Sequence, residues 1–309
     1  IARLEAETGL SAGYRRAGRL IPLPKPHLLK IANRHSAEAE TNWNQQGVHF
    51  SWDVIEQSPY GSGWPASDTT AAGLVSDTFA ARVSPRGLTA MLIARLRQSS
   101  RVTLQEGVAV TAIDPKASRA TLSDGGSVGF GHLIVAAGHA SFPLLSALGP
   151  SLARPLGQAV KGQAALLSAP AVGHDLPLLY LDGLYIVPHE GGQVAIGSTS
   201  EDHFDDPFST DGQLEDLLAR AVQLAPVLAG ADVIERWAGL RPKAIDRDPM
   251  VGAHPQAERV IALTGGFKVS FGLAHMLARA AIASVQGHDG GLPQSFSTAH
   301  HMAVAAGPG

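Results

Sequence analysis

An apolar run that ends in two glycines and leads into a segment rich in Ala and Leu constrains this chain most. Residues 260–263 have the pattern of a short buried strand, and residues 273–285 have the composition of a packed helix. Gly265 and Gly266 between them predict a tight turn. Because the first amides of a helix lack partners, such a turn favours an anionic or electron-rich ligand at the helix N-terminus. The alternative is an ordinary strand–turn–helix without a ligand.

A second apolar run, residues 132–138, also ends in glycine and is typical of a parallel strand buried on both faces. A helix start is expected at Ser84 and Pro85, whereas residues 160–200 have short strand patterns separated by glycine turns. We therefore predict an α/β part and an α+β part that are interleaved along the chain. Further helices are expected at residues 1–7, 25–46 and 214–228, and further strands at 14–23, 102–104, 108–113, 119–122 and 234–240.

Composition narrows the possible functions. A length of 309 residues suits about two domains, and a net charge of −3 provides no broad cationic field for nucleic acid. We expect a cytoplasmic protein without an integral membrane segment, because the sequence has no apolar run long enough to span a membrane and no recognisable signal peptide. The absence of cysteine excludes disulfides, thiolate catalysis and cysteine-ligated metals. The sequence has no G-x-S-x-G, H-E-x-x-H or Walker motif, so we expect neither a serine hydrolase nor a metal site.

Five short motifs follow one another over almost the whole chain. They are residues 84–88 (SPRGL), 133–138 (LIVAAG), 160–163 (VKGQ), 185–188 with 194–199 (YIVP and VAIGST), and 237–242 with 248–252 (WAGLRP and DPMVG). In this order and spacing the chain resembles the FAD-dependent D-amino acid oxidase, glycine oxidase and sarcosine oxidase family. The resemblance implies a glutathione-reductase-like Rossmann domain for FAD, interleaved with an antiparallel-sheet substrate domain.

The resemblance also implies domain boundaries. The FAD-binding domain is expected at residues 84–155 and 245–290, the substrate domain at residues 1–83 and 156–244, and a tail at residues 291–309. The family's opening βαβ unit with G-x-G-x-x-G is expected to be missing, so that the chain begins after the family's first several dozen residues. The near match at residues 61–66 is expected to be a loop, because no buried strand precedes it and Pro65 interrupts it.

Three side chains are implied to act on the substrate. By resemblance, Arg241 binds the substrate carboxylate, Tyr185 adds a hydroxyl, and Lys268 contacts the carboxylate or lies near flavin N5. Arg suits the first role because its planar fork of donors matches a carboxylate. The alternatives are a salt bridge between strand and loop for Arg241, a half-buried strand aromatic for Tyr185 and a solvated surface lysine for Lys268.

The same resemblance implies the cofactor contacts. The backbone of Val110 would meet adenine, and small residues would approach the pyrophosphate closely. These small residues are Ala136, Ala137 and Gly138. The flavin ring would be lined by Gly265, Gly266, Phe267, Lys268, Val269, Ser270, Phe271 and Gly272. Without cysteine for a covalent link, FAD is expected to bind noncovalently, unless one of the 13 histidines forms the link.

The resemblance predicts an FAD-dependent oxidoreductase that oxidises the C–N bond of an amino acid or related amine by hydride transfer to flavin N5. Oxygen or another acceptor would reoxidise the flavin. The protein could also form an oligomer. The alternative is a truncated or degenerate family member that acts as a non-catalytic binding module without FAD.

Overall fold

The computed structural model describes residues 1–44 and 47–307 in two compact units. Unit 1 consists of residues 1–104, 162–200 and 208–238, and unit 2 of residues 105–161, 201–207 and 239–309. Two long strands, β8 (Gly157–Ser168) and β12 (Asp232–Ala244), have residues in both units. The predicted functional domain boundaries differ from the limits of these units and stay a prediction.

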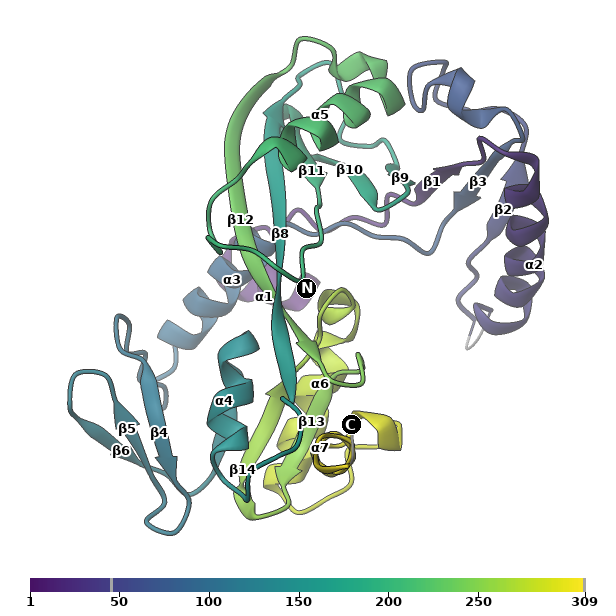
Figure 1. The fold of residues 1–309 in the computed structure, drawn as a ribbon. Helices are drawn as coiled ribbons and strands as arrows, with labels where there is room; N and C mark the ends of the chain where they lie inside the picture. The colour runs from purple at the N-terminus through teal and green to yellow at the C-terminus, as the bar shows by residue number, and fades with distance from the viewer. Residues whose placement is uncertain (45–46, 308–309) are drawn as a thin grey trace. The chain divides into compact units, whose positions relative to one another are not determined.

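Unit 1 is built on an eight-stranded sheet with the order β12-β8-β11-β10-β9-β1-β3-β2 (Figure 1). β1 pairs with β9 in parallel, whereas β3 pairs with β1 and β2, β10 with β9 and β11, and β11 with β8, all antiparallel. Its other strands are β1 (Arg19–Pro22), β2 (Trp52–Ile55), β3 (Leu74–Asp77), β9 (Leu178–Leu181), β10 (Leu184–His189) and β11 (Gln193–Gly197). Its helices are α1 (Ala2–Thr8), α2 (Pro26–Asn42), α3 (Pro85–Arg97) and α5 (Gly212–Leu224), with 3-10 turns η1 (Ser67–Thr70), η3 (Glu190–Gly192) and η4 (Pro226–Leu228).

The two faces of this sheet are covered differently. On β10, Leu184 and Ile186 are 1% and 0% exposed and pack in the core with α5, whereas Tyr185 between them is 39% exposed. This alternation places Tyr185 on the face opposite α5, because successive side chains of a strand point to opposite faces. On that opposite face α2 covers the end formed by β1, β3 and β2, where Ala32 packs with Val75 (Figure 1).

Unit 2 contains a second sheet with the order β13-β14-β7, in which β14 (Ala257–Thr264) lies parallel to β7 (Leu133–Val135). Both faces of β14 are buried: Val260 and Ala262 pack in one cluster with α4 and α7, and Ile261 packs in another with α6. This explains the continuous apolar run. The remaining elements are β4 (Val110–Asp114), β5 (Arg119–Leu122), β6 (Ser127–Gly129), η2 (Gly138–Ala140), α4 (Ser141–Ser146), β13 (Met250–His254), α6 (Ser270–Val285), η5 (Gln294–Phe296) and α7 (Thr298–Ala306).

The predicted fold class is confirmed: a parallel strand pair between helices in unit 2, and a mainly antiparallel sheet in unit 1. The predicted helix start is also confirmed, since α3 begins at Pro85 and the Ser84 side chain accepts the Gly87 N–H. The predicted helix at residues 25–46 is α2, which ends at Asn42, and residues 45–46 lie outside the described residues. Residues 61–66 form turns with one isolated bridge and no helix, as expected.

One predicted strand is wrong. Residues 102–104 form no strand, and their apolar members Val102 and Leu104 are 37% and 40% exposed. An apolar run becomes a strand only where another strand accepts its hydrogen bonds, and none pairs with it among residues 1–44 and 47–307. No helix in the described part of the chain is long and apolar enough to cross a membrane.

Two fully buried histidines in unit 2 predict instability in acid. His254 at the end of β13 and His301 on α7 are both 0% exposed, and burial lowers the pKa of each imidazole below its usual value. The unfolded chain therefore binds more protons as the pH falls below about 6.5, which lowers the free energy of unfolding. We expect a loss of up to about 1.4 kcal/mol per pH unit for each ring, down to its folded-state pKa.

Urea unfolding between pH 7.5 and 5.0 measures this slope. His254→Gln and His301→Gln should each make the free energy of unfolding depend less steeply on pH, by the contribution of one buried ring. His275→Gln, at an exposed position on α6, is the surface control. An equal slope in all four proteins would contradict the assignment of acid sensitivity to the buried rings.

Candidate active site

The ends of two parallel strands form one edge of unit 2. β7 pairs with β14 in the register Leu133↔Val260, and beyond this pairing the Thr264 hydroxyl donates to the Gly138 carbonyl at 2.7 Å. The carboxyl ends of parallel strands in α/β sheets are where ligands bind, because the following loops open there. The two glycine-ended runs recognised in the sequence thus meet at one edge.

The backbone after β7 is open at this edge. Ala136 and Ala137 are exposed, and Gly138 has a φ of +58°. A side chain at Gly138 would meet no atom within 4 Å, so the space beside its backbone is free within the described part of the chain. An open strand end of small residues allows a cofactor phosphate to approach the main chain closely. These residues fit the pyrophosphate end of a dinucleotide.

The turn after β14 requires glycine at its first position. Gly265 has a φ of +74°, and a Cβ there would lie 3.0 Å from the Ala244 Cβ and 3.1 Å from the Met250 nitrogen. Phe267 also has a positive φ, +42°, which is uncommon for a residue other than glycine. After this turn α6 begins at Ser270 without a side-chain cap from Val269. The first amides of α6 are therefore available to an electron-rich ligand atom.

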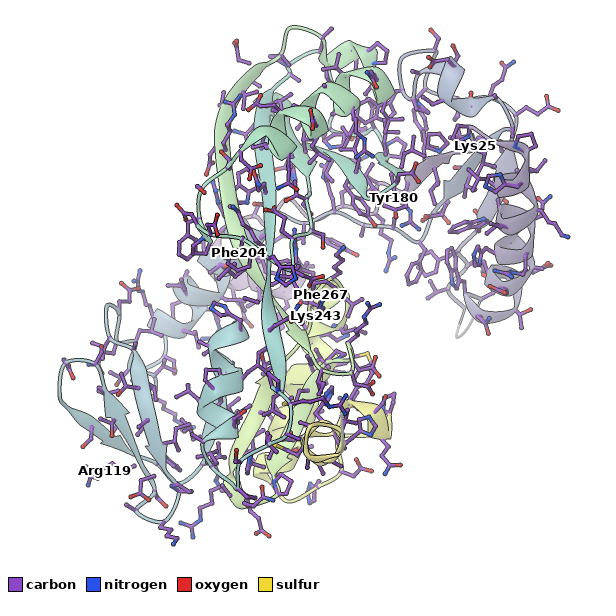
Figure 2. The ribbon with its side chains drawn as sticks, in the orientation of Figure 1. Lys25, Arg119, Tyr180, Phe204, Lys243 and Phe267 are labelled. Atoms are coloured by element: carbon purple, nitrogen blue, oxygen red, sulfur yellow. The ribbon has the colours of Figure 1, made fainter. Side chains whose placement is uncertain are left out.

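The strand that carries Arg241 lies beside this turn. The Phe267 N–H donates to the Pro242 carbonyl at 3.2 Å, and Lys243 forms a β-bridge with Gly266. Figure 2 labels Phe267 and Lys243 next to each other where the turn meets β12. The end of β12 and the predicted flavin-lining turn are thus held together by main-chain hydrogen bonds. Of the predicted site residues, the structure brings Arg241 and the segment from Gly265 to Lys268 into one neighbourhood.

Arg241 shares its surroundings with a buried ion pair. The Lys161 ammonium lies 3.9 Å from the Glu201 carboxylate, and their side chains are 3% and 9% exposed. The two residues also exchange main-chain hydrogen bonds of 2.9 Å in each direction. Burial lowers the pKa of the Arg241 guanidinium, and the negative charge of Glu201 partly offsets this effect. Glu201 therefore interacts with two cations at this position.

The acidic residues that follow β11 have partners in unit 2. The Glu201 side chain is 9% exposed beside Lys161. Asp202 hydrogen-bonds to Lys243 and accepts the Gln158 amide at 2.8 Å, and the Lys243 bond holds the pKa of this carboxyl below its usual value. Sequence reasoning missed these partners, because Lys161 and Glu201 lie far apart along the chain. The motif at residues 160–163, with a lysine inside an apolar strand pattern, was the available signal.

Tyr185, the third predicted substrate residue, lies on β10 of unit 1. It pairs with Gly197 on β11 and Tyr180 on β9, and the centroids of the two tyrosine rings are 4.5 Å apart. Lys268 is exposed, with its ammonium 5.3 Å from the centroid of the Phe267 ring. Val110 begins β4, in a different sheet from β7 and β14, and is 38% exposed. Its predicted contact with adenine stays a prediction.

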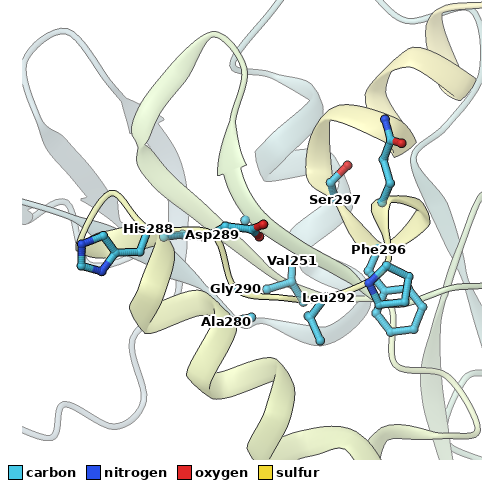
Figure 3. Close-up of a pocket in the computed structure, with 12 residues that line it drawn as sticks. Val251, Ala280, His288, Asp289, Gly290, Leu292, Phe296 and Ser297 are labelled. Atoms are coloured by element: carbon cyan, nitrogen blue, oxygen red, sulfur yellow. The ribbon is translucent and has the colours of Figure 1, made fainter.

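A cavity of about 340 Å³ in unit 2 is formed beside β13 and α6 (Figure 3). Its lining includes Val251, Ala280, Asp289 and Phe296, and none of the predicted site residues. The described residues contain no group of three or more acidic or histidine side chains that could hold a metal ion.

The comparisons with known proteins agree with this geometry. The family model described as FAD dependent oxidoreductase (DAO) matches residues 1–280. The chain belongs to this family. FAD is therefore the cofactor of the family to which the chain belongs, and the resemblance inferred from five motifs is confirmed.

Individual relatives are similar over most of the chain. The bifunctional protein ThiO/ThiG of Synechocystis sp. is 29% identical over 274 residues, which cover 85% of this chain and 37% of that protein. The glycine oxidase of Pseudomonas putida is 31% identical over 237 residues, or 73% of this chain and 63% of that enzyme. The chain thus spans less than two thirds of the length of either relative.

Solved structures share the fold. The glycine oxidase of Geobacillus kaustophilus superimposes with a TM-score of 0.84 at 22% identity, covering 96% of this chain and 78% of that one. The iminodiacetate oxidase of Chelativorans sp. BNC1 superimposes with a TM-score of 0.80 at 24% identity, covering 96% and 79%. The predicted combination of an FAD-binding fold with a substrate domain is confirmed by these neighbours.

Proposed function

We propose that this protein oxidises the C–N bond of an amino acid or related amine, as a glycine-oxidase-like enzyme with noncovalently bound FAD. The observation that carries the proposal is the main-chain contact between the strand of Arg241 and the glycine turn after β14, 3.2 Å from the Phe267 nitrogen to the Pro242 oxygen. It keeps a candidate carboxylate receptor close to the turn that is predicted to line the flavin ring. Bound FAD supplies the hydride acceptor at N5.

In this proposal the carboxylate of the substrate is bound by Arg241. An Arg fork fixes both the position and the orientation of a carboxylate, so that the α-C–H of the substrate faces one direction. The half-buried setting of Arg241 strengthens such a contact, because burial removes competing water. Tyr185 would add a hydroxyl, and Lys268 would place a positive charge near the carboxylate or near flavin N5, where charge develops.

The cofactor would be held mainly by backbone. Ala136, Ala137 and Gly138 would approach the pyrophosphate, and the segment from Gly265 to Gly272 would line the ring. In support, Gly138 has open space beside it, and α6 begins without a side-chain cap. The chain has no cysteine to form a thioether link to the flavin. The identity of the electron acceptor, oxygen or another oxidant, and a cytoplasmic location stay predictions from the sequence.

Anaerobic reduction of the flavin tests the proposal. The full protein, purified and reconstituted with FAD, is mixed with glycine, sarcosine or D-alanine, and the flavin absorbance is followed. We expect at least one of these amines to bleach the flavin bands. A folded, flavin-bound protein that no amine reduces would contradict the amine oxidase assignment. A folded protein that retains no flavin would favour the non-catalytic binding module.

A further inference from the structure

Another cavity in unit 2 lies where β8 begins and β12 ends. Its volume is about 280 Å³, and its wall is formed by two segments, within residues 154–158 and 243–247. Three cations line it, and the described residues of the lining include no carboxylate. These cations are Arg154, Lys243 and Arg247. The residues predicted to contact substrate or cofactor, all of which the structure describes, are not part of this lining. The cavity therefore has a chemistry of its own, that of a site for an anion.

The wall of this cavity is fixed by main-chain packing. The Ile245 N–H donates to the Leu156 carbonyl at 2.8 Å. A Cβ at Gly157 would lie 2.5 Å from the Lys243 carbonyl oxygen, so the two strands approach each other closely there. Leu156 and Ala244 are 0% and 2% exposed. The cations are thus carried by backbone that is held in place before a ligand binds, which lowers the entropic cost of binding.

Arg154 is anchored to the C-terminal end of α7. Its Nη2 donates to the Val304 carbonyl at 2.5 Å, and its main-chain N–H donates to the Ala305 carbonyl at 3.0 Å. Both acceptors are neutral, and within residues 1–44 and 47–307 no carboxylate pairs with the guanidinium. The guanidinium is therefore held in position, and it keeps its full charge and further N–H donors for a ligand.

Arg247 occupies a backbone conformation that favours glycine. It closes the turn after β12, in which its N–H donates to the Ala244 carbonyl at 2.9 Å, and its φ is +64°. A side chain costs energy in this left-handed region, whereas glycine adopts it freely. The exposed Arg247 side chain has no hydrogen bond or ion pair within the described part of the chain that would offset this cost. A strained position that carries an unpaired guanidinium points to a role of that group in binding.

Lys243 is the third cation, and its charge is partly neutralised. Its ammonium hydrogen-bonds to Asp202, whose carboxylate also accepts the Gln158 amide at 2.8 Å. The lysine side chain is 20% exposed, and an ammonium has three donors, so donors remain for a ligand. Asp246 in the neighbouring turn lies 2.7 Å from the His300 Nε2. With Asp202 set against Lys243, the charges of the two arginines remain at the cavity.

These groups suit a phosphate better than a carboxylate. A phosphate monoester carries nearly two negative charges at pH 7 and has three terminal oxygens, whereas a carboxylate has one charge and two oxygens. Two guanidinium groups match that charge, and each presents paired donors to phosphate oxygens. A water molecule occupies about 30 Å³ in the liquid, so a cavity of about 280 Å³ also admits atoms beyond the phosphate group.

We propose that this cavity binds a phosphate group, either that of a small phosphate monoester or free phosphate, through Arg154, Arg247 and Lys243. Asp202 and Gln158 are positioning residues that hold the lysine. The inference does not rest on the proposed function, because no residue predicted to contact the amine or the flavin lines the cavity. It gives the protein a second ligand site besides that for the amine.

Calorimetric titration of the FAD-loaded protein, freed of excess cofactor, tests the proposal. The ligands are inorganic phosphate, glycerol 3-phosphate, glycerol and acetate, in Tris chloride at low ionic strength. We expect both phosphates to bind, acetate to bind at least about tenfold more weakly because it carries less charge, and glycerol not to bind. Tighter binding of glycerol 3-phosphate than of inorganic phosphate identifies a monoester as the ligand; otherwise free phosphate is the ligand. If the protein retains no flavin, the same titration is made on the folded apoprotein.

Arg247→Gly is the most discriminating variant. It removes one guanidinium and should weaken phosphate binding at least about tenfold, as the loss of hydrogen bonds to a charged group allows. Because glycine suits a φ of +64°, urea unfolding should show no loss of stability. Arg154→Gln should weaken binding similarly. Arg119→Gln, at an exposed position on β5 outside the cavity, should leave it unchanged.

Three results would overturn the proposal. The first is an absence of phosphate binding by the wild-type protein, or equal binding by the wild-type protein and folded Arg247→Gly. The second is binding of acetate as tightly as phosphate, which contradicts the assignment to phosphate. The third is an equal loss of affinity in Arg119→Gln and Arg247→Gly, because binding would then follow the net charge of the protein and not this cavity.

Discussion

Replacing Arg241 with Met should lower kcat/KM for the amine substrate about a hundredfold, mainly through a higher KM, because two charge-assisted hydrogen bonds to the carboxylate are lost. Met keeps an unbranched side chain of similar length, so the packing of β12 changes little. Glu201 keeps a cationic neighbour in the variant, since the Lys161 ammonium lies 3.9 Å from it. Steady-state oxidation and anaerobic flavin reduction by the same amine measure the effect.

Arg236→Met is the matched control. Arg236 is on the same strand, but its side chain is 42% exposed and pairs with Glu215 at 3.2 Å. Removing an exposed ion pair of this kind changes stability by no more than about 1 kcal/mol and should leave KM unchanged. If kcat/KM is also unchanged in folded Arg241→Met, the carboxylate receptor lies elsewhere.

The second large effect is expected for Gly157→Ala, which should lower the free energy of unfolding by about 3 kcal/mol. A Cβ at Gly157 would lie 2.5 Å from the Lys243 carbonyl oxygen and 2.5 Å from the Phe142 Cζ. Neither neighbour can yield easily, because the first is backbone and the Phe142 ring is 4% exposed in the core of unit 2. The main chain of β12 next to Arg241 would have to move.

Gly239→Ala separates this clash from the general effect of adding a methyl group to a strand. Gly239 is also on a long strand of the same unit, and a Cβ there would meet no atom within 4 Å. Urea unfolding of both variants should show a large loss for Gly157→Ala and a change within about 0.5 kcal/mol for Gly239→Ala. Equal stabilities would contradict the close approach of β8 to Lys243 and Phe142.

Much of the local structure could be predicted because the determining forces are local. The apolar runs at residues 133–135 and 260–263 became β7 and β14, and Ser84 with Pro85 began α3, because hydrophobic periodicity and capping act over a few residues. The apolar residues 102–104 did not become a strand, because strand formation needs a partner that lies elsewhere in the chain.

The candidate site was predictable only in part for the same reason. The motif around Arg241 and the glycine turn at Gly265 are short segments, and their residue types alone indicate a carboxylate receptor and a close backbone approach. The low exposure of Glu201 was not predictable, because acidic residues in a loop ordinarily stay in water and its partner Lys161 lies far away along the chain.

The family and the strand–glycine–helix segments can be recognised from the amino-acid sequence, because five short motifs and hydrophobic periodicity carry that information within contiguous residues. The tertiary structure decided which segments meet. Thr264 reaches the Gly138 carbonyl, Phe267 reaches that of Pro242, and Arg19 is fixed between Trp52 and Tyr180. Each of these contacts except Phe267 with Pro242 joins residues more than about 30 positions apart, and sheet register, which depends on the packing of whole strands, aligns such distant residues.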